Sequence, residues 1–235
     1  MSLMVLGTVA LDHVKTPSGV KRDMLGGSAV HFAMSARLFT DVHMVAVVGR
    51  DFPNRHLDFL KQEAFVDENN RLTENGVWAS KLRLDQPLLI AECLRKNAFP
   101  ADDDKLLAAV IAPFIYDGDQ DIKITGRRIS RRLTRVYNKV MHTLQPLTNR
   151  MKDAGFAVTP LYMWTASALY DWARGGDWDH IIQELGIADG DMAMLILRTA
   201  DNLRQISSLK DTHPEMATLA FRAREAILRE PVMFL

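Results

Sequence analysis

The pattern of apolar residues changes near residue 64, and this change limits the possible fold more than any other feature of the sequence. Before it, short apolar runs end in a glycine, as after Leu3–Leu6 and after Met44–Val48. Such runs are typical of strands buried in an α/β sheet. After it, apolar residues recur at helical spacing with almost no strand signal. We therefore predict an α+β chain, in which a small N-terminal α/β segment over residues 1–62 precedes an all-α helical domain over residues 63–235.

Capping residues indicate where the helices begin and end. Ser28 follows a pair of glycines and can cap a helix over residues 29–39. Asp85 can cap another helix, with Pro87 in its first turn, where a missing N–H costs little. Pro146 is expected to kink or split the longest helix. The other predicted helices cover residues 73–82, 106–116, 127–154, 163–173, 178–185, 191–209 and a last stretch from 214 to before 231.

The composition is that of a folded protein with enough apolar residues for a core. Of 235 residues, 48% are hydrophobic and 25% are charged, which excludes a disordered or collagen-like chain. Cys93 is the single cysteine, so no intramolecular disulfide and no cysteine-based zinc site can form, and we expect a cytoplasmic location. No uncharged apolar run reaches the roughly 20 residues of a membrane helix, so we expect no membrane contact.

The formal net charge of zero conceals one strongly basic segment. The chain has 29 Lys and Arg residues and 29 Asp and Glu residues. Residues 123–152 contain nine of the cations and no Asp or Glu, so the rest of the chain carries a net charge of −9. The nine are Lys123, Arg127, Arg128, Arg131, Arg132, Arg135, Lys139, Arg150 and Lys152.

Within this segment the cations recur three or four residues apart, which places them on one face of a helix. Like charges so placed repel by about a few tenths of a kcal/mol per pair, and a polyanion would relieve that repulsion through phosphate contacts. The alternative is a solvated face whose charges pair with acidic neighbours such as Asp117, Asp119 and Asp121. The predicted nucleic-acid-binding residues are Arg127, Arg128, Arg131, Arg132, Arg135 and Lys139, with Arg174 and Arg204 as further backbone contacts.

The first part of the chain carries the strings VLGTVALD at 5–12, GGSA at 26–29 and VVGRDFP at 47–53. Over residues 3–60 it resembles the N-terminus of PfkB-type, ribokinase-like sugar kinases. The resemblance implies that Asp12, Gly26 and Gly27 are remnants of a sugar-binding pocket, although His31 replaces an asparagine common in that family. The family's Gly-Ala-Gly-Asp anion hole has no counterpart here, so we predict an incomplete fragment without kinase activity.

The second part carries five further strings: LTENGVWAS at 72–80, LDQPLLIAE at 84–92, LYDWARG at 169–175, DGD at 189–191 and RTADNLRQI at 198–206. Over about residues 60–235 it is similar to the C-terminal helical, DSHCT-type domain of Ski2-like superfamily 2 helicases. The resemblance implies a module that packs beside the helicase motor and helps to guide RNA or DNA. These residues contain no Gly-x-x-x-x-Gly-Lys-[Ser/Thr] loop and no Asp-Glu-x-His box, which excludes ATP-driven unwinding by them alone.

Other site chemistry finds no support in the sequence. The seven histidines form no His-Glu-x-x-His motif, and no Gly-x-Ser-x-Gly elbow occurs, so we predict no metal, no cofactor and no catalytic residue. Aromatic residues cluster at 164–178 and could stack on bases or form the core between helices.

These observations rank three functions. The first is a non-catalytic, nucleic-acid-binding accessory module of a Ski2-like helicase, served by a motor in trans and fused to an incomplete sugar-kinase fragment. The second is a structural or interaction protein that forms homo-oligomers through open sheet edges. The third is a PfkB-type sugar or nucleoside kinase remnant. Because the two resemblances meet near residues 56–63, the chain looks like a chimera, a recombined gene or a designed graft.

Overall fold

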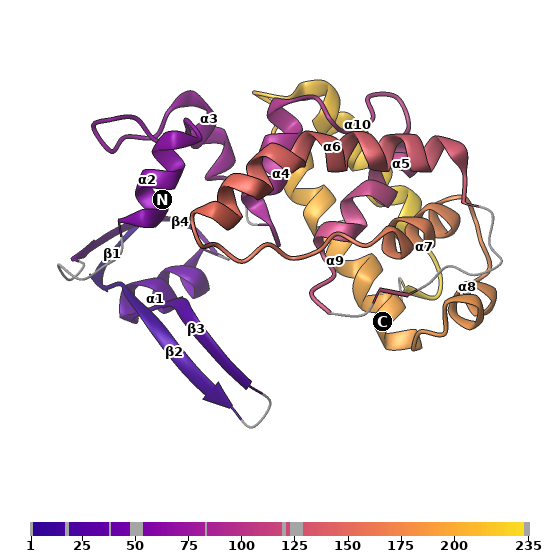
Figure 1. Cartoon of the computed structure of the whole chain (residues 1–235), viewed down its shortest axis with the longest axis horizontal. Helices are drawn as coiled ribbons and strands as arrows, with labels where there is room; N and C mark the ends of the chain where they lie inside the picture. The colour runs from indigo at the N-terminus through magenta and orange to yellow at the C-terminus, as the bar shows by residue number, and fades with distance from the viewer. Residues whose placement is uncertain are drawn as a thin grey trace. The chain divides into compact units, whose positions relative to one another are not determined.

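The computed structural model describes residues 2–16, 19–37, 39–47, 54–82, 84–118, 121–122 and 129–232 (Figure 1). The chain divides into two compact units, Met1–Asp58 and Phe59–Leu235. Their boundary lies inside α2 (Arg55–Gln62), a few residues before the boundary that the sequence pattern predicts at residue 62.

The N-terminal unit consists of two small sheets and one helix. Its elements are β1 (Ser2–Thr8), β2 (Ala10–Thr16), β3 (Gly19–Gly26), α1 (Ser28–Ala36) and β4 (Asp41–Val47). β1 pairs in parallel with β4, and β2 pairs antiparallel with β3. α1 packs against β1 and β4, and it buries Ala29 and Val30 while β1 buries Val5. The strands predicted at Leu3–Leu6 and Met44–Val48 and the helix after Ser28 are confirmed as elements. The expected burial of the first strand is wrong, because β1 lies in a two-stranded sheet and leaves Met4 65% and Leu6 74% exposed.

The hairpin of β2 and β3 was not among the sequence predictions. Its apolar side chains are largely exposed, with Val14 at 41%, Val20 at 55% and Leu25 at 58% of their possible accessible surface. A strand that buries no face shows no alternation of apolar and polar residues, and that alternation is the signal by which strands are found in a sequence.

Among the residues described, the regular elements of the C-terminal unit are helices, apart from one isolated bridge between Val66 and Leu72. After α2, its helices are α3 (Glu74–Ala79), α4 (Pro87–Arg95), α5 (Asp104–Ile111), a 3-10 turn at Ala112–Phe114, α6 (Arg131–Asp153), α7 (Met163–Ala173), α8 (Trp178–Leu185), α9 (Asp189–Ser207) and α10 (Pro214–Ile227). The predicted succession of helices, and with it an α+β chain, is confirmed.

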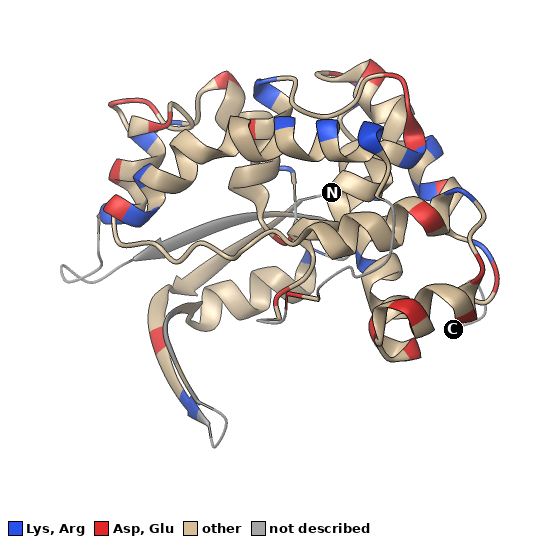
Figure 2. Cartoon of the chain, turned by 45° about the vertical axis from the view of Figure 1, so that its right-hand side comes forward, with Lys and Arg blue, Asp and Glu red and all other residues tan. Residues whose placement is uncertain are grey.

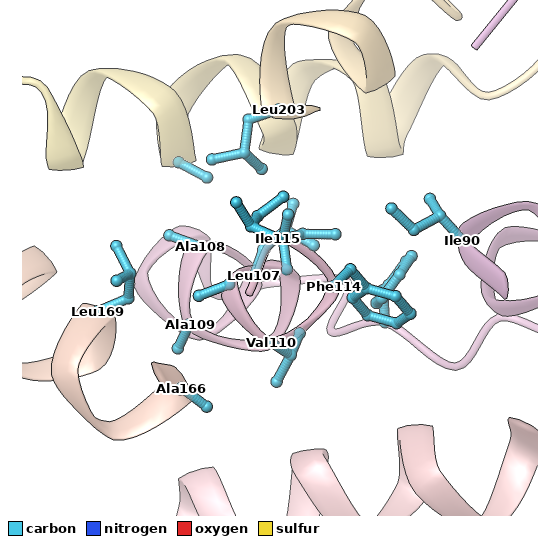
Figure 3. Close-up of a cluster of buried hydrophobic side chains, with 14 of the residues drawn as sticks. Ile90, Leu107, Ala108, Ala109, Val110, Phe114, Ile115, Ala166, Leu169 and Leu203 are labelled. Carbon is cyan, nitrogen blue, oxygen red and sulfur yellow. The ribbon is translucent and has the colours of Figure 1, made fainter. Parts of the chain in front are cut away.

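The core of this unit surrounds α5, which buries six of its eight residues. Figure 3 shows Leu107, Val110 and their neighbours meeting Ile90 of α4, Leu169 of α7 and Leu203 of α9. Small side chains make this close approach possible, since Figure 3 shows Ala109 of α5 beside Ala166 of α7.

The helix ends follow the expected capping chemistry with one correction. Thr73 and Asp103 accept hydrogen bonds from the backbone N–H groups of Gly76, at 3.1 Å, and Leu106, at 2.9 Å, as N-caps of α3 and α5. The prediction that Asp85 caps α4 is wrong, because Gln86 is the N-cap there and Asp85 accepts bonds from α9 instead.

Pro146 was predicted to kink or split the longest helix, and it does not split it, because α6 runs through Pro146 as one helix. Pro146 lies on the exposed side of α6, where water can replace the backbone bond that proline cannot donate. The opposite side of α6 buries Leu133, Val140, Leu144 and Leu147 against the core.

Candidate nucleic-acid interface

The exposed face of α6 carries the described part of the predicted basic ridge. Figure 2 shows Lys and Arg positions recurring along this helix. Arg131, Arg132, Arg135 and Lys139 are all exposed. Arg127 and Arg128 lie outside the described residues.

Two members of the ridge have partners within the unit. The guanidinium of Arg132 lies 3.0 Å from a carboxylate oxygen of Asp103 and 3.7 Å from one of Asp102. The ammonium of Lys139 donates a hydrogen bond of 2.6 Å to the backbone carbonyl of Asn97. These contacts tie α6 to the loop between α4 and α5, so Arg132 and Lys139 serve the fold in addition to any ligand.

Arg131 and Arg135 differ from those two residues. Among the residues that the structure describes, neither guanidinium lies within 4 Å of a carboxylate. They are four positions apart, hence one turn apart on the same face, and they lie at the N-terminal end of α6, where the helix dipole already favours an anion. Together they form a cationic pair, Arg131/Arg135, that is open to an external anion.

The C-terminal half of α6 uses its charge internally. Arg150 donates two hydrogen bonds to the carboxylate of Glu63, at 2.6 and 2.7 Å, and this pairing raises the pKa of Arg150. Glu63 is only 4% exposed, and its backbone carbonyl accepts a bond from Arg95, which also pairs with the buried Glu92. Acidic residues of the fold therefore do neutralise part of the basic segment. The residues that do so are Glu63, Asp102 and Asp103.

The two further cations predicted to contact a nucleic-acid backbone lie on other helices. Arg174, at the end of α7, is exposed and its guanidinium lies over the ring of Tyr170, 5.3 Å from the ring centre. Arg204 of α9 pairs with Asp201 one turn earlier, at 2.6 Å. Both therefore have a local partner, and the described contacts do not bring either one together with Arg131 or Arg135.

The family strings at 84–92 and 198–206 meet in one polar cluster. Asp85 accepts hydrogen bonds from the guanidinium of Arg198 and, at 2.8 Å, from the amide of Asn202. Burial lowers the pKa of Arg198, but hydrogen bonds and charges from Asp85 and Asp117 outweigh burial and raise it. These residues therefore join α9 to the start of α4 and to the chain after α5. The two strings lie far apart in the sequence and come together in this cluster.

The aromatic cluster belongs to the core. Trp164, Tyr170 and Trp172 are buried, and Trp172 meets Trp178 edge to face with ring centres 5.4 Å apart. The indole N–H of Trp172 donates to the backbone carbonyl of Ile227 at 2.8 Å. The sequence left open whether the aromatic rings stack on bases or form the core between helices. These three buried rings form part of the core.

The residues of the predicted sugar-binding remnant do lie together at the end of β1. Gly26 has no room for a side chain because the carboxylate of Asp12 occupies that space, and a Cβ there would lie 1.8 Å from its oxygen. Gly27 has a φ of 99°, which favours glycine, and it precedes α1 as its N-cap. The resemblance to sugar kinases and the oligomerisation through sheet edges both stay predictions.

Burial suppresses the ionisation of two weak acids, the Cys93 thiol and the Tyr137 hydroxyl. It raises the pKa of the Cys93 thiol, with the charge of Glu92 adding to the effect, so the thiolate is not the resting form. Burial, with the charge of Asp121, raises the pKa of Tyr137 to about 12. Within the described part of the chain, no three His, Cys, Asp or Glu side chains gather as a metal site would need.

His213 supplies a pH dependence of stability. Its ring meets Trp78 edge to face with centres 4.7 Å apart, and burial lowers its pKa in the folded chain below the ordinary value of about 6.5. Protonation therefore favours the unfolded chain, so the free energy of unfolding should fall as the pH drops below about 6.5. Urea titrations at several pH values should show a smaller fall in His213→Phe, and an equal fall in both proteins would contradict this assignment.

The described residues of the unit Phe59–Leu235 thus form a helical domain built around α5, with a cationic surface on α6. The chain belongs to the DSHCT (NUC185) domain family, which matches residues 69–235. It is 25% identical over 195 residues to the DExH-box ATP-dependent RNA helicase DExH15 chloroplastic of Arabidopsis thaliana, covering 77% of this chain and 16% of that protein. It is 24% identical over 194 residues to the antiviral helicase SKI2 of Saccharomyces cerevisiae, covering 76% of this chain and 14% of that protein.

These matches confirm the predicted likeness of the helical part to Ski2-like helicases. The chain spans less than one fifth of the length of either relative. The family match begins at residue 69 and leaves the N-terminal unit outside it. No helix in the described ranges is long and apolar enough to cross a membrane.

Proposed function

We propose that the helical unit is a non-catalytic accessory module of a Ski2-like helicase, and that it contacts RNA or DNA through the N-terminal half of α6. The observation that carries this proposal is the cationic pair Arg131/Arg135, which is exposed and has no carboxylate partner among the described residues. The family and the two helicase relatives support the association with a helicase motor.

The electrostatics of α6 favour a polyanionic ligand over a solvated face. Arg131 and Arg132 occupy its first turn, where the positive end of the helix dipole makes cations unfavourable. The N-cap, Ser130, makes no side-chain capping bond, so backbone N–H groups of the first turn add to the positive potential. A phosphate at this position would satisfy the N–H groups and both unpaired guanidinium groups together.

The double substitution Arg131→Ala/Arg135→Ala should weaken binding of the full chain to a labelled single-stranded RNA. Each lost phosphate contact should lower the slope of log K against log salt by about 0.7, hence by about 1.4 for the pair. Fluorescence anisotropy over a range of salt concentrations measures both quantities. Because alanine is the best helix former, the fold should be kept, and circular dichroism checks this.

The matched control is Lys210→Ala/Arg222→Ala, which removes two exposed cations beyond α9 and on α10. This control should leave the salt slope near that of the unchanged protein. Equal losses in the two double variants would mean that only net charge matters, and absence of any salt-sensitive binding would refute the proposal. A DNA strand of the same sequence in a parallel titration determines whether the site prefers RNA.

A further inference from the structure

A second surface of α6 forms a groove that the cationic pair does not use. The groove has a volume of about 540 Å³ and lies between the exposed face of α6 and the chain that leads to α7. Figure 1 and Figure 2 both show this connecting chain returning alongside α6. Its floor is aliphatic, with Leu89, Leu144, Val158 and Leu161 among the lining residues.

The connecting chain runs back along α6 toward Tyr137. It leaves α6 after Asp153, turns at residues 154–155, and the carbonyl of Leu161 accepts a hydrogen bond of 2.5 Å from the Tyr137 hydroxyl, which belongs to a residue sixteen positions before Asp153 on the helix. Those sixteen positions correspond to about 24 Å of helix, a span that the chain and the Tyr137 side chain cover together. Residues 156–162 do so as an extended segment without helix or strand structure.

Both walls of the groove offer backbone groups for pairing. On the extended segment, the N–H groups of Val158, Thr159 and Leu161 make no hydrogen bond with another described residue. On α6, Pro146 has no N–H, so the carbonyl of His142 lacks its usual donor four residues later. Unpaired groups beside an apolar floor are the arrangement that an added extended peptide satisfies.

The α6 wall presents an unbroken row of polar side chains above that floor. The exposed residues Asn138, His142, Gln145, Asn149 and Lys152 recur four or three positions apart and line the groove. Asn and Gln amides can each donate to a peptide carbonyl and accept from a peptide N–H. The groove lining holds one cation, Lys152, and no carboxylate, so its charge favours an acidic occupant.

We propose that this groove binds an extended, acidic peptide segment of a partner protein, paired with residues 157–161 and with alternate apolar side chains on the aliphatic floor. A peptide fits better than a nucleic-acid strand because single-strand sites stack bases on aromatic rings. The groove lining contains no Phe, Tyr or Trp. The site is thus an interaction surface for a protein, separate from Arg131 and Arg135, neither of which lines it.

The test uses the full chain and a fluorescein-labelled octapeptide of alternating valine and glutamate, followed by anisotropy. The peptide should bind, and a copy with lysine in place of glutamate should bind about tenfold more weakly. A copy N-methylated at alternate residues should lose binding, because it cannot donate its backbone N–H groups. The variant Lys152→Glu should weaken the glutamate peptide and strengthen the lysine peptide, whereas the control Lys210→Glu should change neither.

Three results would overturn the proposal. The first is no binding of the glutamate peptide at about 1 mM, and the second is equal binding of the N-methylated copy. The third is binding of a labelled oligouridylate that competes with the peptide and is lost in Asn138→Ala/Gln145→Ala/Asn149→Ala, because the groove would then be a nucleic-acid site. That triple variant alters exposed helix positions only and should keep its helical circular dichroism while losing the peptide.

Discussion

Replacing Trp172 by alanine should lower the free energy of unfolding of the helical unit by about 4–5 kcal/mol, the largest single effect that we expect. Trp172 is fully buried on α7, and its N–H donates to the carbonyl of Ile227, the last residue of α10. The guanidinium of Arg229 lies 3.3 Å from its ring centre and donates to the Trp172 carbonyl at 3.1 Å. Alanine would leave a cavity and would remove the indole donor from the Ile227 carbonyl, which would keep one bond, from the Arg229 N–H at 3.2 Å. It would also leave the partly buried guanidinium of Arg229 without its aromatic partner.

Urea denaturation followed by circular dichroism measures this loss, which is a large share of the roughly 5–15 kcal/mol that stabilises a typical domain. Trp172→Phe should cost less than Trp172→Ala, because it keeps most of the ring volume and loses only the indole donor. The control is Met194→Ala, at an exposed methionine of α9, which should change little. A similar loss in Met194→Ala and Trp172→Ala would show that Trp172 does not hold α7 to the chain after α10.

Replacing Arg150 by methionine should destabilise the same unit by about 3 kcal/mol. The substitution keeps an unbranched apolar stem but leaves the carboxylate of Glu63, 4% exposed, without the two hydrogen bonds that now neutralise it. An uncompensated buried charge costs far more than the loss of an exposed ion pair. Thermal and urea unfolding of the full chain would give the size of the effect.

A double variant distinguishes the loss of the Glu63–Arg150 ion pair from other effects of the substitution at Arg150. Glu63→Gln/Arg150→Met removes both charges, and we expect it to recover a large part of the stability that Arg150→Met loses. Lys152→Met, two residues further along α6 and exposed, is the matched control and should cost only a few tenths of a kcal/mol. If Lys152→Met were as destabilising as Arg150→Met, the general loss of positive charge would be the cause of both effects. The loss of the buried Glu63–Arg150 pair would then not explain the result.

Most of the helices could be predicted from the sequence because their signals are local. Thr73 and Asp103, which are N-caps in the structure, are of residue types that favour this position and lie near the starts of the helices predicted over residues 73–82 and 106–116. Leu133, Val140 and Leu144 of α6 repeat at helical spacing. Asp85 had the same local signal but a different role, because Arg198 and Asn202 compete for its carboxylate. A capping residue and an acceptor of hydrogen bonds from a distant helix look alike until the rest of the fold is known.

The candidate site was only partly open to prediction. Its cations were visible as a segment without acidic residues, but the sequence did not show which of them would be neutralised. The groove beside α6 had no sequence signal, because it depends on how far residues 156–162 must stretch to bring Leu161 to Tyr137. Such a distance is set by the packing of α6 and α7 and not by local preference.

The sequence by itself therefore determined the change from strands to helices, the basic helix and the likeness to DSHCT domains of Ski2-like helicases, because periodicity, composition and short strings are properties of neighbouring residues. Only the tertiary structure decided that Arg132 and Arg150 have carboxylate partners while the described contacts give none to Arg131 and Arg135. The physical reason is that ion pairing depends on distances across the fold, as between Arg150 and Glu63, 87 residues apart in the chain.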